Sequence, residues 1–270
     1  MKYFDQGRNQ LIFEGNQPHS DNWDKGWSTF DLKSYVENSR HERFVSGTTK
    51  QYIKAHKNKR ILEGGCGLGN FVYSLQCNGY DTYGVDFAKR TVKRINDTFP
   101  ELKVTIGDVR KLDFPDNYFD GYWSLGVIEH FYDGYTDILR EMNRVTKKDA
   151  FIFVTFPYMS PLRKIKAKLG LYKRFEEKTF DRNSFYQFGL NAAAVIKDFE
   201  TLGFIFVKEK PLTGLKGMKD EVYFLKKPLQ YLYDGKSFFF RGLSYVISSI
   251  LSPFSGHAVL LIFRNNKGAR

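Results

Sequence analysis

The chain has 270 residues, of which 42% are hydrophobic, so it is long enough for one domain with insertions around a substantial core. Its formal charge of +12 comes from scattered Lys and Arg without a nucleic-acid-binding signature, and the charge alone therefore identifies no nucleic-acid partner. The two cysteines, Cys66 and Cys77, fit no disulfide or metal pattern, and no signal-peptide core or membrane-length apolar run is present, so we expect a cytoplasmic protein.

The first 40 residues are polar with interspersed aromatic side chains, and their periodicity is poor until about residue 32. We predict an N-terminal arm or cap over residues 1–40. Residues 42–56 then predict a helix, because Phe44, Val45, Tyr52 and Ile53 share one side of it.

Residues 60–157 alternate between apolar runs and amphipathic stretches. This rhythm predicts a mostly parallel sheet with helices on both faces, and ligands bind such sheets beyond the carboxyl ends of the strands. The predicted strands are 60–63, 82–86, 103–107, 119–125 and 150–156, and the predicted helices are 70–78, 88–98 and 135–145.

A glycine-rich loop follows the first of these strands, directly after Glu63. Gly65, Gly67 and Gly69 place no Cβ above the loop, so a ligand can lie on the backbone and meet the N–H groups of the next helix. A dinucleotide site needs its third glycine where Asn70 stands, and the charge of Glu63 would face the pyrophosphate. A cationic or zwitterionic ligand therefore suits this loop better.

The segment from Glu63 to Gly69 matches in full the first motif of the class I S-adenosylmethionine-dependent methyltransferases, an acid followed by G-x-G-x-G. The segment from Val127 to His130 also resembles the V-x-E-H segment of the type 11, quinone-biosynthesis-like members. The resemblance implies a Rossmann-like, seven-stranded, mostly parallel sheet with an antiparallel last strand. It also implies S-adenosylmethionine as cofactor, methyltransferase activity (EC 2.1.1.-) and an N-terminal cap over the cofactor.

The same resemblance implies roles for acids at two further strand ends. Asp86 would bind the ribose hydroxyls, with Phe87 packed on the adenine; the alternative is a cap for the next helix. Asp108 would accept from the adenine amino group, with the Val109 N–H reaching the ring; the alternative is a turn aspartate. The other cofactor-binding candidates are Glu63, Gly65, Cys66, Gly67, Gly69, Ser124 and Leu125.

Glu129 and His130 are the catalytic candidates, because the resemblance places them where an acceptor enters. His130 can act as a general base, or it can orient the loop by a hydrogen bond. Some quinone-type members bind a metal through E-x-x-E-H, but Gly126 replaces the first acid here, so we expect no metal.

Residues 158–190 interrupt the alternation and form a predicted insertion on the substrate side. Residues 162–175 predict a basic amphipathic helix, which can lie on anionic lipid or hold a phosphorylated substrate; the alternative is a solvated surface helix. Tyr158, Tyr186 and Gln187 are the substrate-binding candidates, because insertions at this point of the resembled fold commonly line the acceptor pocket.

The rest of the chain predicts a helix over 191–202 and a strand over 204–210 that completes a methyltransferase core of 41–210. Residues 211–256 form an aromatic-rich helical insertion, which can be a substrate lid, a membrane contact, or packing on the sheet edge or on a second subunit. Residues 257–270 contain the last strand, which the resembled fold inserts antiparallel between the fifth and sixth strands, and a tail.

The sequence therefore predicts methyl transfer to a small-molecule, glycan or lipid-linked acceptor, with O-methylation favoured. No N-P-P-Y-type tetrapeptide follows the fourth strand, which argues against amino groups of nucleic-acid bases. Peripheral contact with the inner face of the membrane fits the basic and aromatic segments. The alternatives are a nicotinamide-dependent oxidoreductase and a catalytically inactive nucleoside-binding module, and the oligomeric state stays open.

Overall fold

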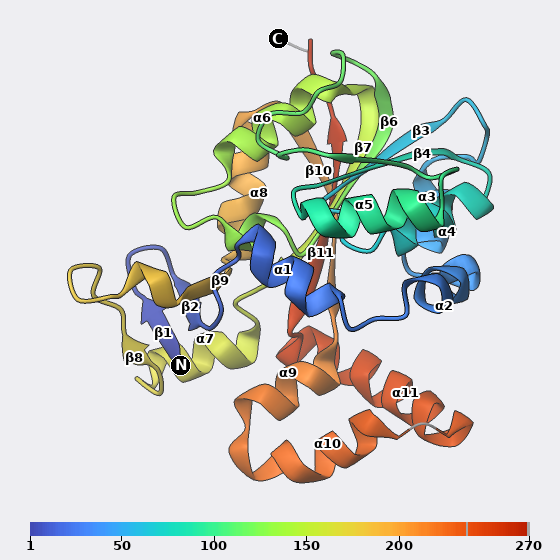
Figure 1. The fold of residues 1–270 in the computed structure, drawn as a ribbon. Helices are drawn as coiled ribbons and strands as arrows, with labels where there is room; N and C mark the ends of the chain where they lie inside the picture. The colour runs from blue at the N-terminus through green and yellow to red at the C-terminus, as the bar shows by residue number, and fades with distance from the viewer. Residues whose placement is uncertain (236, 269–270) are drawn as a thin grey trace. The chain divides into compact units, whose positions relative to one another are not determined.

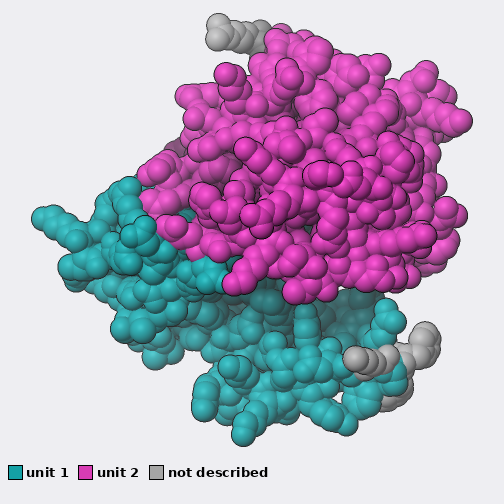
Figure 2. All heavy atoms as spheres, viewed as in Figure 1, with its two compact units in different colours: residues 1–16, 155–196, 208–261 teal, residues 17–154, 197–207, 262–270 magenta. Residues whose placement is uncertain are grey.

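The computed structural model describes residues 1–235 and 237–268, which fall into two compact units (Figure 2). Unit 1 comprises residues 1–16, 155–196 and 208–261. Unit 2 comprises residues 17–154, 197–207 and 262–270. All of the predicted cofactor-binding residues belong to unit 2, whereas the three substrate-binding candidates belong to unit 1.

A seven-stranded sheet has the order β10-β11-β7-β6-β3-β4-β5 (Figure 1). The last strand lies between β7 and β10 and runs antiparallel to its neighbours, which confirms the predicted Rossmann-like sheet. The parallel register pairs Glu63 with Gly84 on one side and with Trp123 on the other. The strands are β3 (Arg60–Gly64), β4 (Asp81–Asp86), β5 (Lys103–Ile106), β6 (Phe119–Leu125), β7 (Thr146–Pro157), β10 (Phe204–Leu212) and β11 (Ala258–Asn265).

The helices of unit 2 cover this sheet with apolar faces. Val72, Val92 and Ile95 are buried in one cluster with Leu32 and Val36, so three helices pack together over β4 and β5. The helix predicted over 42–56 is shorter than expected. The helical elements that begin in unit 2 are α1 (Ser20–Trp27), α2 (Leu32–Glu37), η1 (Asn38–His41), α3 (Val45–Tyr52), α4 (Asn70–Cys77), α5 (Lys89–Thr98), η2 (Ile128–His130) and α6 (Thr136–Val145).

Unit 1 contains a second, four-stranded sheet of order β8-β1-β2-β9, which the sequence analysis did not predict. An antiparallel hairpin joins β1 (Lys2–Asp5) to β2 (Gln10–Glu14). Its edges pair with β8 (Lys173–Arg174) and with β9 (Phe185–Gly189), which follows η3 (Arg182–Ser184).

The basic helix predicted over 162–175 is shorter in the structure, where α7 runs Pro161–Lys168. Ser160 caps its start by accepting from the Arg163 N–H. It ends because Gly170 takes a positive φ of 67°, and the Leu171 N–H then turns back to the Lys166 carbonyl.

Helices α9 (Gly214–Glu221), α10 (Lys226–Asp234) and α11 (Phe238–Ser255) pack together in unit 1, with η4 (Tyr223–Leu225) between α9 and α10 (Figure 1). Helix α8 (Ala192–Thr201) begins in unit 1 and ends in unit 2. Gly214 and Gly217 let α9 approach α11 closely, because a Cβ on Gly217 would overlap the Ser255 carbonyl oxygen. No helix in the described part of the chain is both long enough and apolar enough to cross a bilayer.

Candidate cofactor site

The glycine loop between β3 and α4 forms an open cradle of backbone. Gly65, Gly67 and Gly69 have positive φ angles of 77°, 51° and 73°, which side-chain-bearing residues rarely adopt. A Cβ on Gly65 would stand 2.5 Å from Val127 Cγ2, so space as well as conformation excludes a larger residue. The first N–H groups of α4 follow directly at Asn70.

Glu63 lies at the carboxyl end of β3, beside this cradle, and is buried with 2% exposure. Its Oε2 atom has no hydrogen-bond partner among the described residues. Burial, together with the nearby Asp86, raises the pKa of Glu63 well above its ordinary value. A buried carboxylate without a cation is costly, so Glu63 favours its neutral form until a positive charge lies beside it.

Asp86 ends β4 and holds the glycine loop in place. One carboxylate oxygen accepts from the Gly67 N–H at 2.8 Å, and the other accepts from the Ala88 N–H at 2.9 Å. Burial raises the pKa of Asp86 although these N–H groups act in the opposite direction. Because a carboxylate has about four acceptor positions, these bonds leave acceptor capacity for a ligand hydroxyl group.

The cap of the helix after Asp86 comes from another residue. Asp24 of α1 accepts from the backbone N–H groups of Arg90 and Thr91, the second and third residues of α5, at 3.2 and 2.8 Å. Asp86 is therefore not needed as the cap of α5.

Asp108 follows β5 and is engaged by Arg110. The guanidinium donates to both carboxylate oxygens, at 3.0 and 2.6 Å, and lowers the pKa of Asp108. Both side chains are partly exposed, so a ligand amino group would share this carboxylate with Arg110. Of the neighbouring candidates, Val109 is buried and Phe87 is 41% exposed.

Comparison with known proteins agrees with this geometry, since residues 62–154 match the family described as a methyltransferase domain. Residues 62–154 form a class I methyltransferase domain. The domain is of the class that uses S-adenosylmethionine as methyl donor. The open cradle fits that cationic group, as does the Glu63 Oε2 atom, which has no hydrogen-bond partner in the described part of the chain.

The methyltransferase domain has distant relatives. A probable S-adenosylmethionine-dependent methyltransferase of Mycobacterium tuberculosis is 28% identical over 97 residues, which are 36% of this chain and 35% of that protein. The malonyl-[acyl-carrier protein] O-methyltransferase of Erwinia pyrifoliae is 24% identical over 115 residues, 43% of this chain and 44% of that one. The chain thus spans less than half the length of these curated relatives.

Solved structures share the fold of the whole chain. The [4+2]-cyclase SpnF superimposes with a TM-score of 0.55 at 16% identity, over 95% of this chain and all of that one. Similarity at this level of identity shows a shared fold, and the reaction has to be inferred from the residues of the site.

An aromatic pair from α1 lies at the cradle of the methyltransferase domain. Trp23 and Trp27 stack with ring centroids 5.2 Å apart, and a Cβ on Gly67 would stand 3.2 Å from the Trp27 ring. Trp23 also packs edge-on against His130 at 5.3 Å. Both tryptophans are among the aromatic side chains of the predicted N-terminal arm, and their i, i+4 spacing is the sequence signal that places them on one helix face.

Glu129 and His130, the catalytic candidates, lie on η2 directly after Gly126 and Val127. Glu129 is buried, its Oε2 atom has no hydrogen-bond partner among the described residues, and burial raises its pKa to about 8. At neutral pH it is therefore mostly protonated, and a cation beside it would favour its charged form.

The remaining predicted site residues differ in their surroundings. Ser124 is buried, and its Oγ atom has no hydrogen-bond partner in the part of the chain that the structure describes; Leu125 is half-buried at the end of β6. The Cys66 side chain packs against Gly84, where an added Cβ would stand 2.8 Å from Cys66 Sγ. Burial raises the pKa of the Cys66 thiol well above its ordinary value, which keeps the thiol uncharged and weakly reactive. In the described chain, no three His, Cys, Asp or Glu side chains gather as a metal site.

The substrate-binding candidates lie in unit 1. Tyr158 is buried and its carbonyl accepts from Arg163 at 2.8 Å. Tyr186 and Gln187 of β9 line a large pocket of that unit.

Proposed function

We propose that the chain transfers a methyl group from S-adenosylmethionine to a small-molecule, glycan or lipid-linked acceptor, preferentially onto oxygen. The buried carboxyl group of Glu63, whose Oε2 atom has no hydrogen-bond partner among the described residues, lies beside a Cβ-free loop and carries this proposal, because it suits a cationic donor and opposes a pyrophosphate. The O-methyltransferase activity named for the Erwinia relative supports oxygen as the attacked atom.

In this proposal the donor supplies an activated methyl group, and the protein's work is to bind, align and exclude water. Glu63 would pair with the donor's positive charge, and Ser124 and Leu125 would lie along its amino-acid part. Asp86 would accept hydrogen bonds from the ribose hydroxyls, and Phe87 would pack on the adenine. Asp108 would accept from the adenine amino group, and the Val109 N–H would donate to the adenine ring.

A base is needed only when the acceptor keeps its proton near neutral pH. We assign that role to His130, since Glu129 is itself mostly protonated there. Replacing His130 with Asn should lower the turnover of a hydroxyl acceptor and leave cofactor affinity unchanged. Loss of cofactor affinity instead would mean that His130 only orients the loop.

The defining experiment is titration calorimetry of the full chain with S-adenosylmethionine and S-adenosylhomocysteine, with NAD as the contrasting ligand. We expect both adenosyl ligands to bind, Asp86→Ala to weaken them strongly, and Asp97→Ala, an exposed acid on α5, to change nothing. NAD binding in their place would support the oxidoreductase alternative. Adenosyl binding without transfer to any hydroxyl acceptor would support the inactive nucleoside-binding module.

We also propose a cytoplasmic location with contact at the inner face of the membrane, and an acceptor pocket that includes Tyr158, Tyr186 and Gln187. The support is a set of exposed apolar side chains on the helices of unit 1, among them Phe224, Tyr231, Tyr245 and Ile250. Co-sedimentation with anionic vesicles tests the contact, which should disappear in a Phe224→Ser, Ile250→Ser variant that retains cofactor binding.

A further inference from the structure

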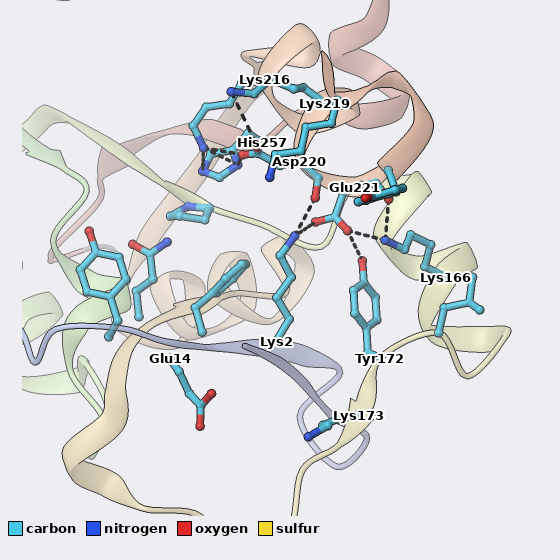
Figure 3. Close-up of a pocket in the computed structure, with 17 residues that line it drawn as sticks. Lys2, Glu14, Lys166, Tyr172, Lys173, Lys216, Lys219, Asp220, Glu221 and His257 are labelled. Atoms are coloured by element: carbon cyan, nitrogen blue, oxygen red, sulfur yellow. Dashed lines mark hydrogen bonds and ion pairs between the residues drawn. The ribbon is translucent and has the colours of Figure 1, made fainter. Parts of the chain in front are cut away.

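Unit 1 contains a large pocket that the methyltransferase domain does not explain. Its volume is about 920 Å³, and it is lined by six lysines but only three carboxylates (Figure 3). The charged lining residues are Lys2, Lys166, Lys173, Lys216, Lys219, Lys226, Glu14, Asp220 and Glu221, and His257 joins them. We call it the basic pocket.

One side of the basic pocket is built around a single carboxylate, in a group we call the Glu221 cluster. Lys2, Arg163 and Lys166 donate to Glu221 at 2.7, 3.0 and 2.8 Å, and the Tyr172 hydroxyl donates at 2.7 Å. Burial acts to raise the pKa of Glu221, but the surrounding cations outweigh it and lower the pKa to about 2. Three cations therefore share one permanent negative charge.

The other side gathers two lysines around Asp220 and His257. Lys216 donates to Asp220 at 2.8 Å and lies 2.9 Å from His257 Nε2, and Lys219 lies 3.8 Å from Asp220. Burial and the cations Lys216 and Arg163 lower the pKa of His257 to about 3, so its ring stays neutral. This side therefore also holds more positive than negative charge.

The third acid of the pocket, Glu14, does not neutralise the excess positive charge of the other two sides. Figure 3 shows the Glu14 carboxylate pointing away from the other labelled acids, and it pairs with the terminal amino group of Met1 at 3.2 Å. Lys226, which also lines the pocket, has no carboxylate partner in residues 1–235 and 237–268. A purely structural ion-pair network would balance its charges, whereas this one keeps an uncompensated positive surplus inside a concavity.

We propose that the basic pocket binds a phosphate or diphosphate group. Several ammonium groups on separate elements converge on one cavity, and such point-charge donors match the spread oxygens of a phosphate. The methyl donor itself carries a positive sulfonium centre and does not suit this lining. Tyr186 and Gln187, which also line this pocket, belong to the acceptor pocket proposed above, but the observations that favour phosphate binding lie within unit 1 and do not require methyl transfer.

Titration calorimetry of the full chain with inorganic pyrophosphate tests the site. We expect saturable binding that weakens with added salt and falls at least tenfold in a Lys216→Gln, Lys219→Gln variant, which leaves the Glu221 cluster intact. Lys226→Gln should weaken pyrophosphate binding by a smaller factor. Because Lys226 is exposed and has no acid partner among the described residues, this change should not affect folding. The matched control is Lys164→Gln, Lys168→Gln, whose exposed side chains on α7 do not line the pocket.

Absence of saturable binding at low salt, or an equal loss in the control variant, would overturn the proposal. S-adenosylhomocysteine affinity, measured on the same samples, separates this result from failure of the proposed function. A nucleoside diphosphate sugar and vesicles containing phosphatidylglycerol then serve as competitors. Displacement of pyrophosphate by the first identifies a soluble diphosphate as the natural source, and displacement by the second identifies a lipid phosphate.

Discussion

The two units treat a buried carboxyl group in opposite ways. In unit 1, Glu221 is surrounded by three cations and a tyrosine hydroxyl, which lower its pKa to about 2. In unit 2, Glu129 has no cation partner among the described residues, and burial raises its pKa to about 8. The pKa of Glu63 is raised by the same cause.

This difference in partners distinguishes a carboxylate with a structural role from carboxyl groups that are suited to bind a ligand. The Glu221 cluster is satisfied within the protein, so its carboxylate organises the pocket and leaves the cations in excess. One carboxyl oxygen of Glu63 and one of Glu129 have no hydrogen-bond partner among the described residues, so both groups are suited to a cation that arrives with a ligand. In our two proposals, unit 2 therefore binds a positively charged ligand and unit 1 binds a negatively charged one.

The largest effect should come from Glu221→Gln. This change leaves Lys2, Arg163 and Lys166 without their shared charge, and removing one partner from a buried ion network costs about 3–5 kcal/mol. Urea unfolding at pH 7, followed by circular dichroism, measures the loss. Glu177→Gln is the control, because that carboxylate is 68% exposed and its pair with Arg182 contributes about 1 kcal/mol at most. Equal stability of the two variants would contradict the structural role of the cluster.

Glu129→Gln should change the pH dependence of stability. Between its ordinary pKa and about 8, folded Glu129 keeps a proton that the unfolded chain has released, so rising pH destabilises the fold. Stability from this group is fully present below about pH 4.5 and decreases by about 2 kcal/mol between pH 6 and pH 8. The glutamine variant should lack this decrease, and Glu63 contributes the same slope to both proteins. Thermal unfolding across pH 5–8.5 tests it; identical slopes would mean that Glu129 is solvated.

Gly217→Ala should displace the Glu221 cluster without touching a charge. The new methyl group would overlap the Ser255 backbone and push α9 from α11, at a cost of about 2 kcal/mol. Gly242→Ala, in the open middle of α11, should instead stabilise by up to about 1 kcal/mol. Urea midpoints of the two variants should therefore move in opposite directions, and pyrophosphate affinity should fall only in the first.

The sequence predicted the parts of unit 2 that local order determines. Glu63, Asp86 and Asp108 each follow an apolar run at βα spacing, so their strand ends could be placed at one edge of the sheet before the structure was known. The spacing does not show what else binds these acids. The ion pair of Arg110 with Asp108 and the capping of α5 by Asp24 depend on side-chain geometry, which the sequence pattern does not contain.

Unit 1 was much less predictable, because its contacts join distant segments. Lys2 and Glu221 are 219 residues apart in the sequence, and the β1–β2 hairpin pairs with β9 across about 175 residues. Neither of these long-range contacts produces a periodic pattern in the sequence. The predicted basic helix was partly right, but Arg163 points into the protein and is 1% exposed, whereas a charge pattern alone suggests a solvated face.

Asp24 represents a third way to bury a carboxylate, in which backbone N–H groups and the Thr91 hydroxyl replace any cation. Asp24→Ala should cost about 1–2 kcal/mol, whereas Asp31→Ala, which removes the exposed cap of α2, should cost about 0.5–1 kcal/mol. Asp24 also fastens α1 to α5 and so keeps Trp27 at the glycine loop. S-adenosylhomocysteine affinity, measured below the unfolding range, should therefore decrease in Asp24→Ala and stay unchanged in Asp31→Ala. If both variants bind equally well, α1 takes no part in holding the cofactor, and the cradle alone supplies the affinity.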